Sequence, residues 1–80
     1  MTKMEKYTNT FVEALEIEAE QVKGLTYQAI DNWDSVGHMT LIATIEEAFG
    51  IMMETDDIID FSSFETGIEI LKKYDVDVEA

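Results

Sequence analysis

Apolar side chains spaced three and four residues apart constrain this fold more than any other feature of the sequence. The spacing predicts a first helix that begins after Thr2 and ends within residues 15–19, with Glu5 completing a capping box. It predicts a second helix that begins at the cap Asp34 and ends at Gly50, a residue type common at helix C-termini. Proline is absent and no segment reads as a convincing strand, so the pattern predicts an all-α fold.

The C-terminal part predicts two more helices. A short one is expected over residues 56–60, where acidic residues in the first turn complement the helix dipole. Ser62 and Glu65 stand in capping-box spacing and predict the start of a last helix that runs to the basic residues 72–73. Residues 75–80 are expected to form a frayed acidic tail.

Residues 21–34 form a connection that is too apolar for a fully solvated loop, and we expect Trp33 to anchor it over the helices. Residues 1–80 are therefore predicted to form one domain, a small bundle of three longer helices plus one short helix. The side chains expected in its core are Phe11, Leu41, Ile45, Phe49, Phe64 and Ile68.

The chain is strongly acidic. It has 18 Asp and Glu residues against 5 Lys, which gives a formal net charge of −13. Binding to a nucleic acid or to an anionic membrane surface is not expected, because both need clustered basic residues. The charge either keeps a small protein soluble or presents an acidic surface to basic partners, and the sequence leaves both readings open.

Cysteine is absent, which excludes disulfides, thiolate metal sites and a thiol nucleophile supplied by the chain itself. No run approaches the roughly 20 apolar residues of a transmembrane helix. The N-terminus also lacks the apolar segment of a signal peptide. We expect a cytoplasmic, monomeric protein with no resident metal ion and no insertion into a membrane.

Ser35 lies where the long connection meets the second predicted helix. The free backbone amides and the positive dipole end of a helix start make a favourable place for a phosphate group. Asp34 serves either as a helix cap or as a recognition acid, and Gly37 lets a bulky group approach the backbone closely. Taken alone, however, an Asp-Ser pair before an apolar helix is also an ordinary N-cap.

Four segments stand in the order and at the spacing found in acyl carrier proteins. Residues 34–39 read DSVGHM, and the apolar helix that follows ends in EEAFGI at residues 46–51. Residues 55–57 form an acidic stretch, and residues 61–64 form the step FSSF into the last helix. Over residues 3–74 the chain therefore resembles the acyl carrier protein family, and in particular its stand-alone members.

The resemblance implies that Ser35 carries a 4′-phosphopantetheine arm, attached from coenzyme A by a phosphopantetheinyl transferase. Asp34, Gly37 and His38 would form the rest of the attachment site. The thiol of the arm would hold an acyl or aminoacyl group as a thioester, and the chain itself would not be an enzyme. The implied partners are ligases, synthases or acyltransferases of fatty-acid, polyketide or specialised biosynthesis. A D-alanyl carrier fits the same pattern, and a non-covalent acidic helical adaptor is the alternative of another class.

His38 is the single histidine and raises the question of a Ser-His-Asp hydrolase with Ser35 and Asp34. Neighbouring residues at a helix start cannot form the relay in which Asp orients His and His takes the serine proton. We therefore expect His38 to be a surface residue near the phosphate or a partner interface. A calcium loop beginning at Asp31 is also excluded, because neither the glycine nor the glutamate that it needs is in place.

One face of the second helix offers either additional core or a docking strip for basic partner enzymes, and the resemblance favours docking. The residues predicted to take part are the apolar Val36, Met39 and Ala43 and the acidic Glu46, Glu47, Asp56 and Asp57.

Overall fold

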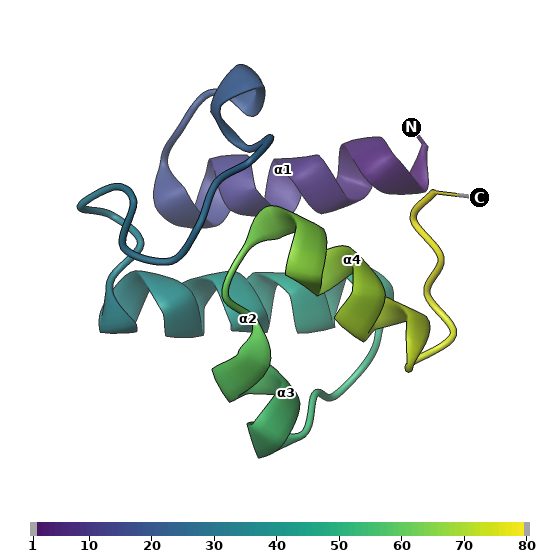
Figure 1. Cartoon of the computed structure of the whole chain (residues 1–80). Coiled ribbons are helices and arrows are strands. Elements are labelled where there is room, and N and C mark those ends of the chain that lie inside the picture. Colours follow the sequence, from purple (N-terminus) through teal and green to yellow (C-terminus); the bar gives the residue numbers. More distant parts are fainter. Residues whose placement is uncertain (1, 80) are drawn as a thin grey trace.

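The computed structural model describes residues 2–79, which form helices joined by loops (Figure 1). The one strand-like pairing within this range is an isolated bridge between Thr26 and Ser63. The predicted all-α fold is confirmed, with a short 3₁₀ turn in addition. The elements are α1 (Lys3–Leu15), η1 (Ala19–Gln21), α2 (Ser35–Phe49), α3 (Thr55–Asp60) and α4 (Phe64–Lys72).

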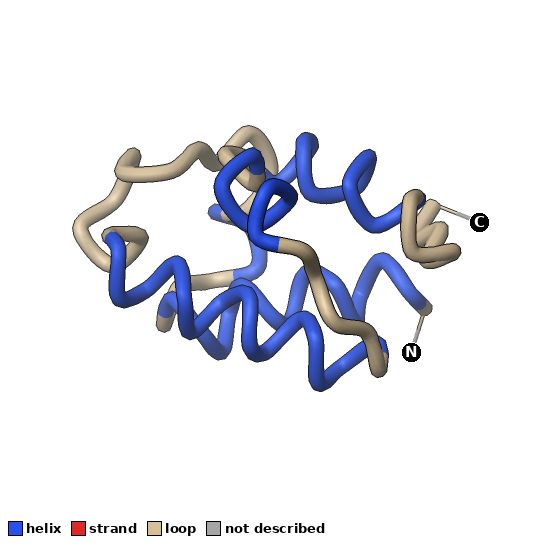
Figure 2. Tube along the Cα trace, turned by 90° about the horizontal axis from the view of Figure 1, so that it is seen from below, coloured by secondary structure: helices blue, strands red, loops and turns tan. Residues whose placement is uncertain are grey.

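The helices α1 and α2 lie side by side and run in opposite directions (Figure 1). The helix α4 packs across this pair, and the short α3 leads into it. Figure 2 shows the long loop between η1 and α2 at one end of the molecule and both ends of the described chain at the other. The start of α2 is therefore next to the long loop and far from the termini.

The boundaries of α1 are set locally, as predicted. The Thr2 hydroxyl accepts from the Glu5 amide and the Glu5 carboxylate accepts from the Thr2 amide, each over 3.0 Å. The helix ends at Leu15 because Glu16 adopts a left-handed conformation with φ 55°. Both observations confirm the expected capping box and the expected end.

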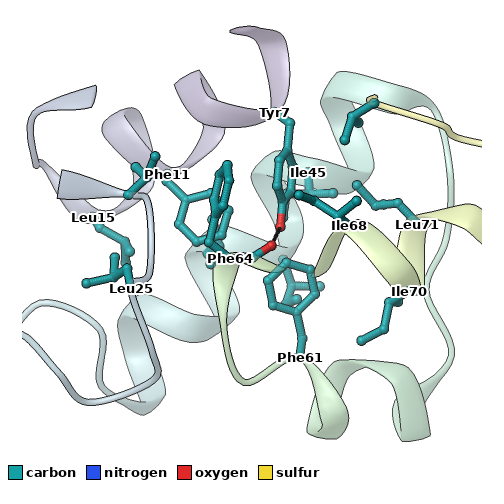
Figure 3. Packing of buried hydrophobic residues seen from close by; sticks show 14 of the residues in the cluster. Tyr7, Phe11, Leu15, Leu25, Ile45, Phe61, Phe64, Ile68, Ile70 and Leu71 are labelled. Carbon is teal, nitrogen blue, oxygen red and sulfur yellow. Dashed lines mark hydrogen bonds between the residues drawn. The ribbon is translucent and has the colours of Figure 1, made fainter. Parts of the chain in front are cut away.

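Aromatic rings fill the centre of the core, where α1 faces α4 and the long loop (Figure 3). The buried Tyr7 hydroxyl donates to the Phe64 carbonyl over 2.7 Å, and burial raises the pKa of this phenol. Phe11 lies edge-on to Trp33 and to Phe64, with ring centres 5.5 and 5.2 Å apart. Trp33 is fully buried, which confirms that it anchors the loop.

The helix α2 also begins and ends where the sequence predicts. The Asp34 carboxylate accepts from the Gly37 amide over 2.8 Å, and Gly50 ends the helix with φ 64°. Leu41 and Ile45 are buried as expected.

At the end of α2 the predicted core is right only in part. Phe49 packs against the core but is only partly buried, and the Lys6 ammonium lies 5.3 Å from the centre of its ring. A cation over an aromatic ring is a favourable contact at such a partly exposed position. The other predicted core residues, Phe11, Leu41, Ile45, Phe64 and Ile68, are buried.

The cap of α4 is Ser63 and not the predicted Ser62. The Ser63 hydroxyl accepts from the Thr66 amide over 2.9 Å. Ser62 instead offers its carbonyl to the Tyr27 amide over 2.9 Å, and the Glu65 carboxylate accepts from the Gly24 amide. Contacts with the long loop therefore move the helix start by one residue.

The predicted frayed tail is wrong for most of its length. Val78 is 2% exposed and Val76 is partly buried, so the chain after α4 folds back onto the core. The Val76 amide donates to the Leu71 carbonyl over 3.0 Å, and Lys72 forms an ion pair with Glu79 over 3.4 Å. Ala80, the last residue of the predicted tail, lies outside the described residues.

Candidate functional site

Ser35 is the first residue of α2, and it is exposed. The preceding Asp34 caps the helix, because its carboxylate accepts from the Gly37 amide, and Asp34 is itself exposed. The amides of Ser35 and Val36 begin the helix, where backbone N–H groups have no partner within the helix. A hydroxyl thus stands at the positive end of the α2 dipole.

An open pocket of ≈ 330 Å³ lies beside Ser35, where α2, α3 and the long loop meet. Its walls are mostly apolar, and a few polar groups are placed at its rim. A pocket of this size holds a small ligand or a section of a longer one. The residues that line it are Tyr27, Ser35, His38, Met39, Ile58, Ile59, Phe61 and Ser62.

His38 is placed differently from the prediction. Its ring is half-buried in the pocket wall, where Nδ1 accepts from the buried Trp33 indole over 2.9 Å. The other nitrogen, Nε2, lies 2.8 Å from the Ile58 carbonyl. His38 is therefore less exposed than predicted, because two hydrogen bonds hold the ring between the long loop and α3, although it lines the same pocket as Ser35.

These contacts also bear on the hydrolase question. The Asp34 carboxylate accepts from the Gly37 amide, and the two ring nitrogens of His38 contact the Trp33 indole and the Ile58 carbonyl. In residues 2–79, no carboxylate orients His38 toward Ser35. The arrangement required for an activated serine is not present.

Gly37 also allows a close contact within the chain itself. A methyl group at this position would overlap the backbone carbonyl of Asn32 and touch the Leu15 side chain. The Asn32 amide group in turn donates to the Leu15 carbonyl over 2.8 Å. The close neighbour of Gly37 is therefore the chain's own loop, which packs against the first turn of α2.

The predicted docking strip is exposed along α2. Val36 is 75% exposed and Met39 56%, and Ala43 is exposed as well. Of the acidic residues on the helix, Glu47 is exposed, whereas Glu46 is half-buried and accepts from the Met53 amide over 2.8 Å. The structure thus brings an apolar strip and an acidic residue together on the surface.

The two predicted acids of α3 differ. Asp56 is exposed, but Asp57 is buried, so its placement on the acidic surface is wrong. The Asp57 carboxylate accepts from Lys73 over 2.8 Å and from the Tyr74 hydroxyl. These hydrogen bonds lower the pKa of Asp57, and the bond from Lys73 has the larger effect. The Tyr74 hydroxyl also accepts from the Glu54 amide, so the cluster fixes α3 to the end of α4.

Sequence reasoning missed three residues of this region. Tyr27 belongs to the apolar connection of residues 21–34, and its hydroxyl lies 3.4 Å from Ser35 Oγ. Met52 and Ile59 are 87% and 71% exposed, and Ile59 lines the pocket beside Ser35. The adjacent Met52 and Met53 differ in burial. A loop has no regular spacing from which the sequence could predict which of the two is exposed.

In residues 2–79, no group of three or more histidine, aspartate and glutamate side chains is placed to hold a metal ion. None of the described helices is both long enough and apolar enough to span a bilayer. No family model, no curated protein and no solved structure matches the chain.

Proposed function

We propose that this chain is an acyl carrier protein whose Ser35 carries a 4′-phosphopantetheine arm. The observation that carries the proposal is the exposed Ser35 hydroxyl at the first turn of α2, on the rim of an apolar pocket. The order of motifs around it, from Asp34 to the last helix, supports the same reading.

The attachment chemistry needs little from the chain. The Ser35 oxygen would bond to the phosphorus that carries the pantetheine, the bond from that phosphorus to adenosine bisphosphate would break, and the serine proton would leave. A transferase supplies the base for this step, since the ring nitrogens of His38 are engaged with Trp33 and Ile58. The new phosphodiester would lie at the amide-rich start of α2, which favours negative charge.

The surroundings of Ser35 suit a carrier. The pocket can receive part of the arm or of a small acyl group, because its walls are apolar and it opens beside the attachment point. The exposed Val36 and Met39 offer contact area to a partner enzyme, and acids such as Glu47 favour basic partners. We propose that its partners are cytoplasmic enzymes. They would load an acyl or aminoacyl group, including D-alanine, onto the thiol of the arm and later remove it.

The alternative is a non-covalent acidic adaptor, which the exposed apolar side chains Met39, Met52 and Ile59 also favour. Such a surface would serve a partner whether or not an arm is attached. The two functions differ in one chemical event at Ser35.

The deciding experiment is to incubate the apo protein with coenzyme A and a broad-specificity transferase and to weigh it intact. A carrier gains the mass of one phosphopantetheine, and Ser35→Ala abolishes the gain. Thr40→Ala is the matched control, because it removes another exposed hydroxyl of α2 and should leave the gain intact. No added mass on the wild-type protein, or an addition that survives Ser35→Ala, would overturn the carrier proposal.

A further inference from the structure

Tyr27 reaches the attachment point from outside α2. Its hydroxyl lies 3.4 Å from Ser35 Oγ, longer than the usual hydrogen bond between two hydroxyls, so any bond between them is weak. Tyr27 and Ser35 line the same pocket, one from the long loop and one from the helix. A carrier needs only Ser35 for the covalent bond, so the phenol has no role in the function proposed above.

The backbone fixes where this phenol lies. The Tyr27 amide donates to the Ser62 carbonyl over 2.9 Å, and the bridge between Thr26 and Ser63 holds the residue before it. Gln28, the residue after it, is held in a left-handed conformation with φ 66°. The Gln28 amide donates to the Trp33 carbonyl over 3.0 Å, which holds this turn in place.

Packing fixes the ring as well. Tyr27 lies edge-on to Trp33 and to His38, with ring centres 6.1 and 5.3 Å apart. Both neighbours are themselves joined by a hydrogen bond. The Tyr27 hydroxyl is therefore preorganised beside Ser35 and needs no ordering when a group is attached there.

A phosphodiester on Ser35 would shorten the distance between the Tyr27 hydroxyl and the nearest acceptor oxygen. Its non-bridging oxygens lie two bonds beyond the ester oxygen, so one that turns toward Tyr27 comes closer to the phenol than Ser35 Oγ does now. No lysine lines the pocket, and the net charge of −13 leaves few cations for a phosphate. A neutral O–H donor adds a hydrogen bond to the charged oxygen, and such bonds are stronger than those between neutral groups.

We propose that Tyr27 is a positioning residue for the arm, whose hydroxyl donates to a non-bridging oxygen of the phosphodiester on Ser35. The inference rests on the proposed function. The hydrogen bond fixes the phosphate on the pocket side of α2 and sets the direction in which the arm leaves. A positioning residue of this kind holds the arm in one orientation. Each partner enzyme that binds the carrier would then encounter the arm in the same orientation.

The test compares Tyr27→Phe with the wild type in both the apo and the holo forms. In the apo form the substitution removes one long hydrogen bond, and we expect a small change in melting temperature. In the holo form it removes a bond to a charged oxygen and should lower the melting temperature by about 4 °C more. The phosphorus-31 resonance of the arm should also shift between the wild-type and Tyr27→Phe holo proteins.

Tyr74→Phe is the matched control, because it removes a phenol hydroxyl that bonds to Asp57, away from Ser35. It should lower the melting temperature of both forms equally and leave the phosphorus resonance in place. In the wild-type holo protein, NMR should show contacts between the Tyr27 ring protons and the methylene next to the phosphate.

The outcomes separate the two proposals. If Ser35 accepts no arm, the carrier function and the role of Tyr27 both fall. If Ser35 accepts the arm but Tyr27→Phe affects both forms equally and the ring contacts are absent, Tyr27 only packs the loop. The carrier proposal then stands and the positioning role is wrong.

Discussion

The buried Trp33 indole donates its N–H to Nδ1 of His38 over 2.9 Å, which fixes the proton of the neutral imidazole on the opposite nitrogen. That nitrogen, Nε2, then donates to the Ile58 carbonyl over 2.8 Å. A single ring on α2 therefore joins the long loop to α3. Since the same ring lines the pocket beside Ser35, the wall of the candidate site depends on this pair.

Replacing His38 by Leu tests the pair. The substitution keeps an apolar side chain but leaves the Trp33 indole N–H unpaired in the core. We expect the free energy of unfolding to fall by about 1–3 kcal/mol, the usual penalty for a buried donor without a partner. Urea unfolding followed by circular dichroism measures the change.

The control is a double-mutant cycle that combines His38→Leu with Trp33→Phe, which removes the indole donor. Because the two side chains share one hydrogen bond, the double variant should lose less stability than the sum of the single variants. Strict additivity, or an unchanged His38→Leu protein, would show that the bond contributes nothing.

Gly37→Ala tests the close approach of the loop to α2. Alanine is the better helix former by about 1 kcal/mol. Its methyl group, however, would overlap the Asn32 carbonyl, so we expect a net loss of about 1–3 kcal/mol of stability. Backbone NMR shifts should move at Asn32 and at Leu15, whose carbonyl accepts from the Asn32 side chain.

Gly50→Ala is the comparison, because an added methyl group there meets open space and only the left-handed φ of 64° is strained. It should lower stability without moving the resonances of Asn32. Equal shifts at Asn32 in both variants would contradict a local overlap at Gly37.

The contribution of Asp57 to stability should depend on pH. The Lys73 ammonium and the Tyr74 hydroxyl lower the pKa of Asp57 in the folded protein below its ordinary value of 3.8. A depressed pKa contributes stability that is fully present above the unfolded value and is lost as the pH falls through the folded value. Wild type should therefore be more stable than Asp57→Asn at neutral pH, and the difference should shrink below pH 3.8.

Thermal unfolding of both proteins across the acid range measures this difference. Glu47→Gln serves as the control, since Glu47 is exposed and its loss should not change the acid dependence. A gap between wild type and Asp57→Asn that stays constant down to pH values well below 3.8 would contradict the prediction.

The parts of the fold that could be predicted from the sequence are those set within a few residues. The Thr2–Glu5 capping box and the ends of α2 at Asp34 and Gly50 each depend on hydrogen bonds or backbone angles inside one turn. The cap of α4 could not be read in this way. The local spacing of Ser62 and Glu65 favours a cap at Ser62, but the long loop engages both residues and the cap falls on Ser63.

At the candidate site, too, local features could be predicted and contacts between distant segments could not. The position of Ser35 at a helix start follows from its neighbours in the sequence. The partners of His38 do not, because Ile58 lies 20 residues away along the chain. Asp57 and Lys73 are 16 residues apart, and only packing of α3 against the end of α4 brings them together. Charge alone therefore placed Asp57 on the surface, whereas the fold buries it.

The C-terminal segment gives the last prediction. Val78 is 2% exposed, although its acidic neighbours Asp77 and Glu79 suggested a solvated tail. Val78→Ala removes buried methyl groups and leaves a cavity, which should lower the free energy of unfolding by about 1–3 kcal/mol. Val36→Ala is the same substitution at a side chain that is 75% exposed, and it should change stability by less than about 0.5 kcal/mol. Because the two variants differ only in burial, urea unfolding of the pair isolates the contribution of the segment after α4. Equal effects of the two substitutions would mean that this segment does not pack against the core in solution.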